Sequence, residues 1–234
     1  MLAWFFLMFH TVRYLRMIQI YSRIKFKLYR PRVNYNRPPQ VCDVRNEWKE
    51  PIQHSISLLS KWKFRFLNEE HSIQSSDDWD KPQISKLWRY NLHYFDDLNS
   101  CNSSARIVLH RELLAKWIQD NPPAIGSGWE SYPTSLRIVN WIKWDMAGNE
   151  LSAECIQSLA IQIRWLSKHL EFHILGNHIF ANAKAIIYAG LFFDGPEADK
   201  WLFTGLGILK YEVKEQILKD GGHFERSPMY HAII

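Results

Sequence analysis

The sequence predicts a mainly α-helical (all-α) fold built from helical hairpins, with a few short strands or extended segments near residues 60–97. Two patterns support this prediction. From Ser104 onward, apolar residues recur at intervals of three and four over several long segments, which is the period of helices that bury one face. Short loops separate these segments, so consecutive helices are expected to fold back on one another.

The composition is that of a globular protein, with 47% hydrophobic and 23% charged residues among 234. The charge is uneven. Residues 1–42 carry eight basic side chains and no acidic one, whereas the remainder carries 21 basic and 24 acidic ones, a net charge of −3. The main body therefore lacks the basic surface typical of nucleic-acid binding, and we expect no nucleic-acid partner.

Residues 1–42 are expected to form a basic amphipathic helix and a linker. Apolar side chains between Val12 and Leu28 follow a helical period, and Pro31, Pro38 and Pro39 end the helix. Such a helix can make peripheral contact with an anionic membrane surface, or it can pack on the main domain with its arginines in solvent. We favour packing. Met1–Phe9 lacks the flanking features of a cleavable signal peptide, which leaves a cytoplasmic location open.

The middle of the chain is expected to be partly extended. Trp62–Leu67 alternates as a strand does, and Lys86–Asp97 is dense in aromatic residues with little helical period, so we predict a short strand or extended segment there. The later segments are predicted to be helices. Their ranges are 104–120, 132–146, 151–170, 178–193 and 199–219, and a last helix begins near Ser227.

Two segments carry clusters of polar residues at helix beginnings. One is Gly176-Asn177-His178, and the other runs from Asp220 to His231 as DGGHFERSPMYH. Helix beginnings attract anions through their free N–H groups, so a substrate with a carboxylate would suit them. Each residue also has a structural interpretation: Asn177 as a helix cap, and Asp220-Gly221-Gly222 as a turn.

A metal or other cofactor is not expected. His173 and His178 are five residues apart and His223 and His231 eight apart, and neither spacing places two ligands on one helical face. The three cysteines are far apart and contain no CxxC pair, which argues against a zinc knuckle or a disulfide framework.

Four segments together resemble the heparinase II/III-like polysaccharide lyases, which are similar to several alginate-lyase families. They are LWRYNLHYFDDL, GWESYPTSLRIVNWIKW, NHIFANAKAIIYAGLFF and ILKDGGHFERSPMYH, and the resemblance covers roughly residues 60–234. It implies that residues 43–234 form an incomplete (α/α) toroid, normally followed by a β-sandwich. That sandwich is absent from this sequence, and a separate chain could supply it. The resemblance also implies a bacterial cell-envelope or periplasmic protein that acts on an acidic polysaccharide.

The reaction implied by the resemblance is β-elimination at a uronic acid. It assigns neutralisation of the sugar carboxylate to Asn177 and His178, with His178 also a candidate base, and makes Tyr230 the acid or base. Further candidates surround these three. His223, Glu225, Arg226 and His231 are expected beside them, and Arg137, Trp129, Tyr132, Trp88 and Tyr90 are expected to line the sugar.

Two other functions remain open at this point. A glycoside hydrolase needs two carboxylates that flank the scissile bond, and the candidates are Asp96, Asp97, Glu130 and Glu225. Alternatively, the chain is a non-catalytic glycan-binding protein or an inactive truncated fragment linked to surface-polysaccharide assembly.

Overall fold

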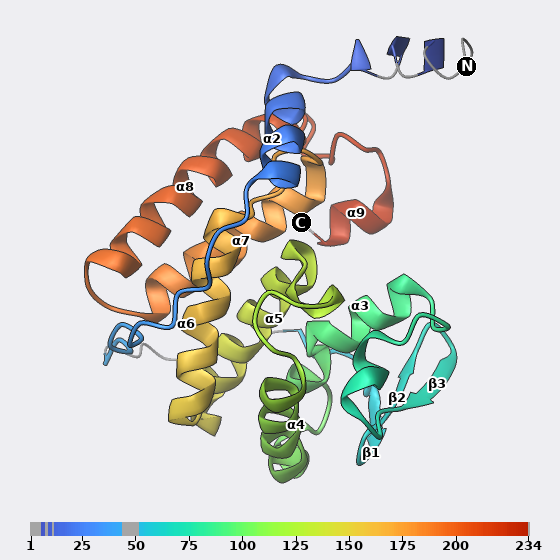
Figure 1. The fold of residues 1–234 in the computed structure, drawn as a ribbon, viewed down its shortest axis with the longest axis vertical. Coiled ribbons are helices and arrows are strands. Elements are labelled where there is room, and N and C mark those ends of the chain that lie inside the picture. The colour runs from blue at the N-terminus through green and yellow to red at the C-terminus, as the bar shows by residue number, and fades with distance from the viewer. Residues whose placement is uncertain (1–5, 8, 11, 44–51, 234) are drawn as a thin grey trace.

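The structure is a computed structural model, which describes residues 6–233 except 8, 11 and 44–51. It is mainly helical, as predicted (Figure 1). The helices are α2 (Met17–Leu28), α3 (Lys86–Tyr94), α4 (Ile107–Asp120), α5 (Ser131–Trp144), α6 (Ala153–Lys168), α7 (Gly176–Phe192), α8 (Pro196–Gln216) and α9 (Pro228–Ile233). Among the described residues, no helix combines the length and apolar character needed to cross a membrane.

A small antiparallel sheet precedes the main helices. Its strands β1 (Leu58–Ser60), β2 (Lys63–Phe66) and β3 (Glu69–Ser72) pair in sequence order. The strand predicted within Trp62–Leu67 is thereby confirmed. The sheet packs against α3, where the ring centroids of Phe66 and Trp88 are 5.2 Å apart.

The prediction of an extended segment at Lys86–Asp97 is wrong, because residues 86–94 form α3. Ser85 caps this helix by accepting a hydrogen bond from the Trp88 N–H, and Trp88 and Leu92 are buried one turn apart. Phe95 then adopts a left-handed conformation and ends the helix. Burial of a face rich in aromatic residues thus outweighs the weak helical preference of those residues.

Helices α5, α6, α7 and α8 form the body that carries the predicted site. Helices α5 and α7 run parallel, because Tyr132 contacts His178 and Ser135 contacts Asn182 in the same order along both helices. Helices α7 and α8 are joined by a short turn and lie very close together. A Cβ atom on Gly190 would come within 2.6 Å of the backbone of Leu202, so this approach depends on glycine.

The core is unusually aromatic. Its largest fully buried side chains include five tryptophans, which are Trp79, Trp88, Trp117, Trp141 and Trp144. Edge-to-face contacts join several of them, for example Trp117 and Trp141 with ring centroids 5.8 Å apart. Most of the aromatic residues in and next to α3 and α5 are therefore part of the core.

The predicted N-terminal helix and linker are both present. The linker, residues 29–41, is mostly extended and runs along α6, where Arg164 donates to the backbone oxygen of Asn36 at 2.7 Å. Helix α2 lies against the body, as expected from the packing alternative, but none of its residues is buried.

Candidate active site

Asn177 and His178 lie in the first turn of α7. The chain enters this helix through Leu175 and Gly176, which have positive φ angles of 68° and 58°. Leu175 also has a ψ of −155°, a conformation that costs a residue with a side chain about 1–3 kcal/mol, so neighbouring contacts must hold the entry in place. Among the described residues, no side chain caps this helix. Its first N–H groups therefore stay available to an anion.

A chain of hydrogen bonds fixes the ring of His178. Its Nδ1 lies 3.1 Å from Oε1 of Glu171, and a carboxylate can only accept, so Nδ1 carries the proton. In the neutral ring, Nε2 is then the basic nitrogen. Glu171 in turn accepts from Asn182 at 3.1 Å, and Asn182 also donates to Ser135 on α5 at 2.9 Å.

A row of rings extends from His178 across α5 to α3. The His178 and Tyr132 rings are 4.5 Å apart, Tyr132 and Tyr94 are 6.0 Å apart, and Tyr94 and Tyr90 are 6.5 Å apart. The Tyr90 hydroxyl donates to Glu130, and burial followed by this hydrogen bond raises the pKa of Tyr90 well above its usual value. The structure thus brings together Tyr90, Tyr132 and His178, although they come from three different helices.

The loop between α8 and α9 reaches the start of α7. Nε2 of Gln216 donates to the Gly176 carbonyl at 2.9 Å, and Oε1 of Gln216 lies 3.1 Å from Nε2 of His223. A Cβ atom added to Gly176 would lie 3.2 Å from the carboxylate of Glu225. His223 is only 2% exposed, so it holds the loop against the end of α8 and does not itself reach the surface.

Asn177 lines a cavity of about 400 Å³ at this junction. Carboxylates surround it, from Glu212, Glu215 and Glu225, and one of them pairs with Arg16 of α2. Burial raises the pKa of Glu212 above its usual value, more than its hydrogen bond with Gln216 lowers it. The polar character of this side of Asn177 is therefore acidic, in contrast to the side that α5 and α7 share.

Lys143 on α5 and Lys184 on α7 lie close enough for the charge of one to act on the other. Lys143 is eleven residues after Tyr132, so it lies on nearly the same face of α5 as Tyr132, which contacts His178. Burial lowers the pKa of both lysines, and the charge of Lys143 lowers that of Lys184 further. Neither ammonium group forms an ion pair with a described residue. An anionic group bound between them would relieve this repulsion.

Three predicted sugar-contacting residues lie in the core instead. Trp88 and Arg137 are 0% exposed and Trp129 is 4% exposed, which corrects the expectation that they line the sugar. Arg137 donates to Gln162 at 2.9 Å, and its guanidinium group lies 3.9 Å from the centre of the Trp117 ring. Burial lowers its pKa well below the usual value. Arg137 therefore links segments of the core and does not contact a ligand.

The remaining predicted residues lie on the last loop and helix. Arg226 is exposed and has a positive φ of 54°. Tyr230 and His231 belong to α9, five and six residues after Glu225, but their side chains lie outside the described part of the structure. Their roles therefore stay predictions. Within the described residues, no group of three or more His, Cys, Asp or Glu side chains is arranged to hold a metal ion.

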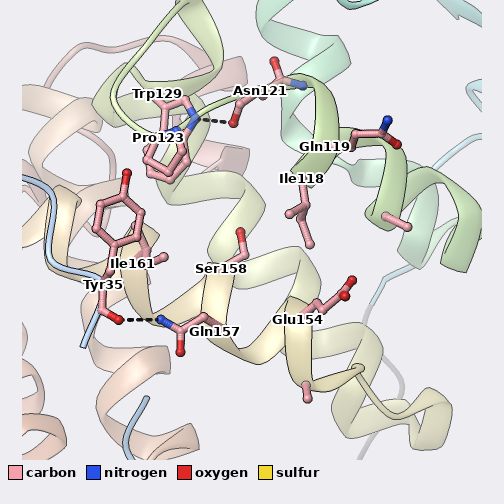
Figure 2. A pocket seen from close by; sticks show the side chains of 12 residues that line it. Tyr35, Ile118, Gln119, Asn121, Pro123, Trp129, Glu154, Gln157, Ser158 and Ile161 are labelled. Carbon is pink, nitrogen blue, oxygen red and sulfur yellow. Dashed lines mark hydrogen bonds between the residues drawn. The ribbon is translucent and has the colours of Figure 1, made fainter. Parts of the chain in front are cut away.

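A second cavity, of about 710 Å³, lies between the linker and the helices α4 and α6 (Figure 2). Trp129 and Tyr35 line it, and Gln157 donates to the backbone oxygen of Tyr35 at 3.2 Å. Neither Asn177 nor His178 lines it. This cavity is therefore separate from the site at the start of α7.

Sequence reasoning missed Glu171, Lys143 and Lys184. Helical spacing alone could have found Lys184, because a residue seven after Asn177 returns to the same face. Glu171 lies in the loop before α7, and no periodicity connects a loop residue with His178. Its role could be read only from the folded chain.

Comparison with known proteins supports the resemblance. The model of the family described as "Heparinase II/III N-terminus" matches residues 78–234, about two thirds of the chain. The chain is similar to proteins named "Heparin-sulfate lyase" from three bacteria. It is 44% identical to that of Bacteroides stercoris over 57 residues, 35% identical to that of Pedobacter heparinus over 79, and 30% identical to that of Bacteroides thetaiotaomicron over 131.

These similarities are partial. The aligned segments cover 24%, 33% and 51% of this chain but only 9%, 12% and 19% of the three relatives, respectively. No solved structure gives a significant match. The matched range of the family model contains α3 to α9, and with them both polar segments singled out in the sequence. The chain belongs to the heparinase II/III family, of which it carries the N-terminal domain.

Proposed function

We propose that this chain acts on an acidic polysaccharide that contains uronic acid, as part of a lyase that cleaves by β-elimination. The observation that carries this proposal is the arrangement along the parallel pair α5 and α7. Asn177 and His178 stand at one end of it, and Lys143 and Lys184, neither of which forms an ion pair with a described residue, lie further along the two helices. Such an arrangement suits a linear polyanion better than a neutral glycan.

The proposed reaction removes the C5 proton beside the sugar carboxylate. The electrons of the C5–H bond form the C4=C5 double bond, the C4–O bond breaks, and the departing oxygen takes a proton. The Asn177 amide donates to the carboxylate, where negative charge builds up, and a donor of this kind lowers the barrier by roughly 3–4 kcal/mol. His178 Nε2 is the candidate base, because Glu171 occupies Nδ1.

Tyr230 is assigned to protonate the departing oxygen. The support is positional: the loop that holds Glu225 against Gly176 leads directly into α9, which contains Tyr230. The family resemblance gives it the same role. We place the protein in the cell envelope and propose that the helical domain is an incomplete toroid, completed by a β-sandwich that a further part of the protein or a separate chain supplies.

The glycoside hydrolase alternative is less well supported. Burial alone would raise the pKa of Asp97, but hydrogen bonds from His110 and two backbone N–H groups, together with Arg106, lower it overall. A hydrolase needs a carboxyl group with a raised pKa as its acid. Asp97 instead ties β1 to α4.

The test is incubation of the protein with several uronic-acid polysaccharides while the ultraviolet absorbance of unsaturated uronide ends is followed. We expect absorbance to rise with at least one of them. Tyr230→Phe should abolish the rise while circular dichroism and glycan binding stay nearly unchanged, and Asn177→Asp should abolish it and also weaken glycan binding, because its carboxylate repels that of the substrate. New reducing ends without absorbance would identify a hydrolase, and binding without either product would support the non-catalytic alternative. Full activity of Tyr230→Phe would show that another group is the acid.

A further inference from the structure

Helix α2 is amphipathic, but its apolar face points away from the protein. Met17, Tyr21, Ile24 and Leu28 follow one another at intervals of four, three and four residues, and therefore form one stripe. Their side chains are 79%, 64%, 55% and 77% exposed. Burial of exposed apolar side chains is favourable, so a partner that covered this stripe would bind to it.

The opposite face of α2 makes the contacts with the body. The Phe26 ring stacks on His173 with centroids 4.5 Å apart, and Gln19 donates to the backbone oxygen of Ile174 at 3.5 Å. Arg16, just before the helix, pairs with Glu215 of α8. Phe26 is two residues before Leu28 and nine after Met17, so it lies about half a turn from the stripe. These contacts orient the helix with Met17, Ile24 and Leu28 outward, whereas Tyr21 also lines a cavity between α2 and the body.

Positive charge flanks the stripe on both sides. Lys27 projects beside one edge and Lys25 beside the other, and both are exposed. Arg23 lies nearer the side that faces the body, where its charge acts on His173. No acidic residue occurs in residues 1–42. The exposed apolar surface continues upstream, where Phe6, Phe9 and Tyr14 are 60%, 66% and 73% exposed. In Figure 1 this segment extends away from the body beyond α2.

We propose that α2 docks on the surface of a membrane that contains anionic lipids. The stripe enters the boundary between headgroups and acyl chains, and the flanking Lys25 and Lys27 contact the lipid phosphates. An apolar groove on another protein would account for the stripe but not for the charges beside it. Positive charge on both edges, without an acidic residue, is complementary to a membrane surface that is negatively charged throughout.

The experiment is co-sedimentation of the full chain with vesicles, either of phosphatidylcholine alone or with phosphatidylglycerol added. We expect binding to the anionic vesicles only, weakened by salt. Ile24→Ser/Leu28→Ser and Lys25→Gln/Lys27→Gln should each reduce binding at least tenfold. Because no residue of α2 is buried, these variants should fold normally. The control is Phe203→Ser, which removes an apolar side chain 81% exposed on α8.

The outcomes separate the possible occupants of the stripe. Failure of the unaltered chain to bind anionic vesicles overturns the proposal, as does equal binding by Ile24→Ser/Leu28→Ser or an equal loss in Phe203→Ser. Sedimentation of the chain as a dimer that depends on Ile24 and Leu28, without vesicle binding, would assign the stripe to a second copy. The measurement needs no lyase activity, so it is independent of the proposed reaction.

Discussion

Glu171 accepts a hydrogen bond from His178 at 3.1 Å, across the loop that joins α6 to α7. We predict that Glu171→Gln lowers kcat about 100-fold, because a ring displaced by 1 Å loses that much. KM should change little, since Glu171 is 7% exposed and does not meet the substrate. Steady-state kinetics measure both, with the exposed Glu154→Gln as control. A change in KM alone would assign Glu171 to substrate binding.

Lys143 and Lys184 are predicted to bind an anionic group of the substrate. Lys143→Gln and Lys184→Gln should each raise the Kd for a uronic-acid oligosaccharide roughly tenfold, which corresponds to 1.4 kcal/mol. The dependence of binding on salt should also weaken. Calorimetric titration measures these effects, and Lys200→Gln on the exposed face of α8 is the matched control. Unchanged binding in both variants would place the polyanion elsewhere.

Gly128 and Gly207 should respond oppositely to alanine. A Cβ atom on Gly128 would lie 2.7 Å from the buried His93 ring, so Gly128→Ala should destabilise the protein by about 1–3 kcal/mol. Nothing lies within 4 Å of the corresponding position on Gly207 in α8. Gly207→Ala should therefore stabilise it by about 0.5–1 kcal/mol. Urea denaturation measures both changes, and a destabilised Gly207→Ala would contradict the packing of α8.

His93 is predicted to make stability depend on pH. Burial, followed by the charge of Arg137, lowers its pKa from 6.5 to about 3. Below about pH 6.5 the unfolded chain therefore binds a proton at His93, whereas the folded chain does not. The free energy of unfolding should have its full value above that pH and fall progressively towards pH 3. The loss should amount to several kcal/mol.

The matched variant for this pH dependence is His93→Gln. It loses stability at neutral pH, because Trp117 and the Trp79 carbonyl each form a hydrogen bond with the His93 ring. Its free energy of unfolding should nevertheless fall less steeply between about pH 6.5 and pH 4. Urea denaturation at several pH values compares the two slopes. Parallel slopes would assign the pH dependence to other groups.

The sequence predicted the long helices well because each has a continuous apolar stripe, as in residues 107–120 and 153–168. It failed at Lys86–Tyr94, where aromatic residues obscured the repeat of Trp88 and Leu92. Which side chains lie at the surface and which lie in the core was harder to predict. Trp88, Trp129 and Arg137 have side chains that suit a sugar site, but the fold buries all three. Local pattern determines which face of a helix is apolar, whereas burial depends on contacts between segments distant in sequence.

The glycine-dependent contact between α7 and α8 has a consequence for how the site is assembled. Gly190 and Gly205 bring the two helices so close together that a Cβ atom added to either glycine would lie 2.6 Å from an atom of the facing helix. This close packing restricts sliding of α7 along α8. Asn177 and His178 therefore belong to a helix that is held firmly in place by its neighbour. If the proposed reaction takes place, the movement that brings Tyr230 to the sugar is expected in residues 217–227, which join α8 to α9.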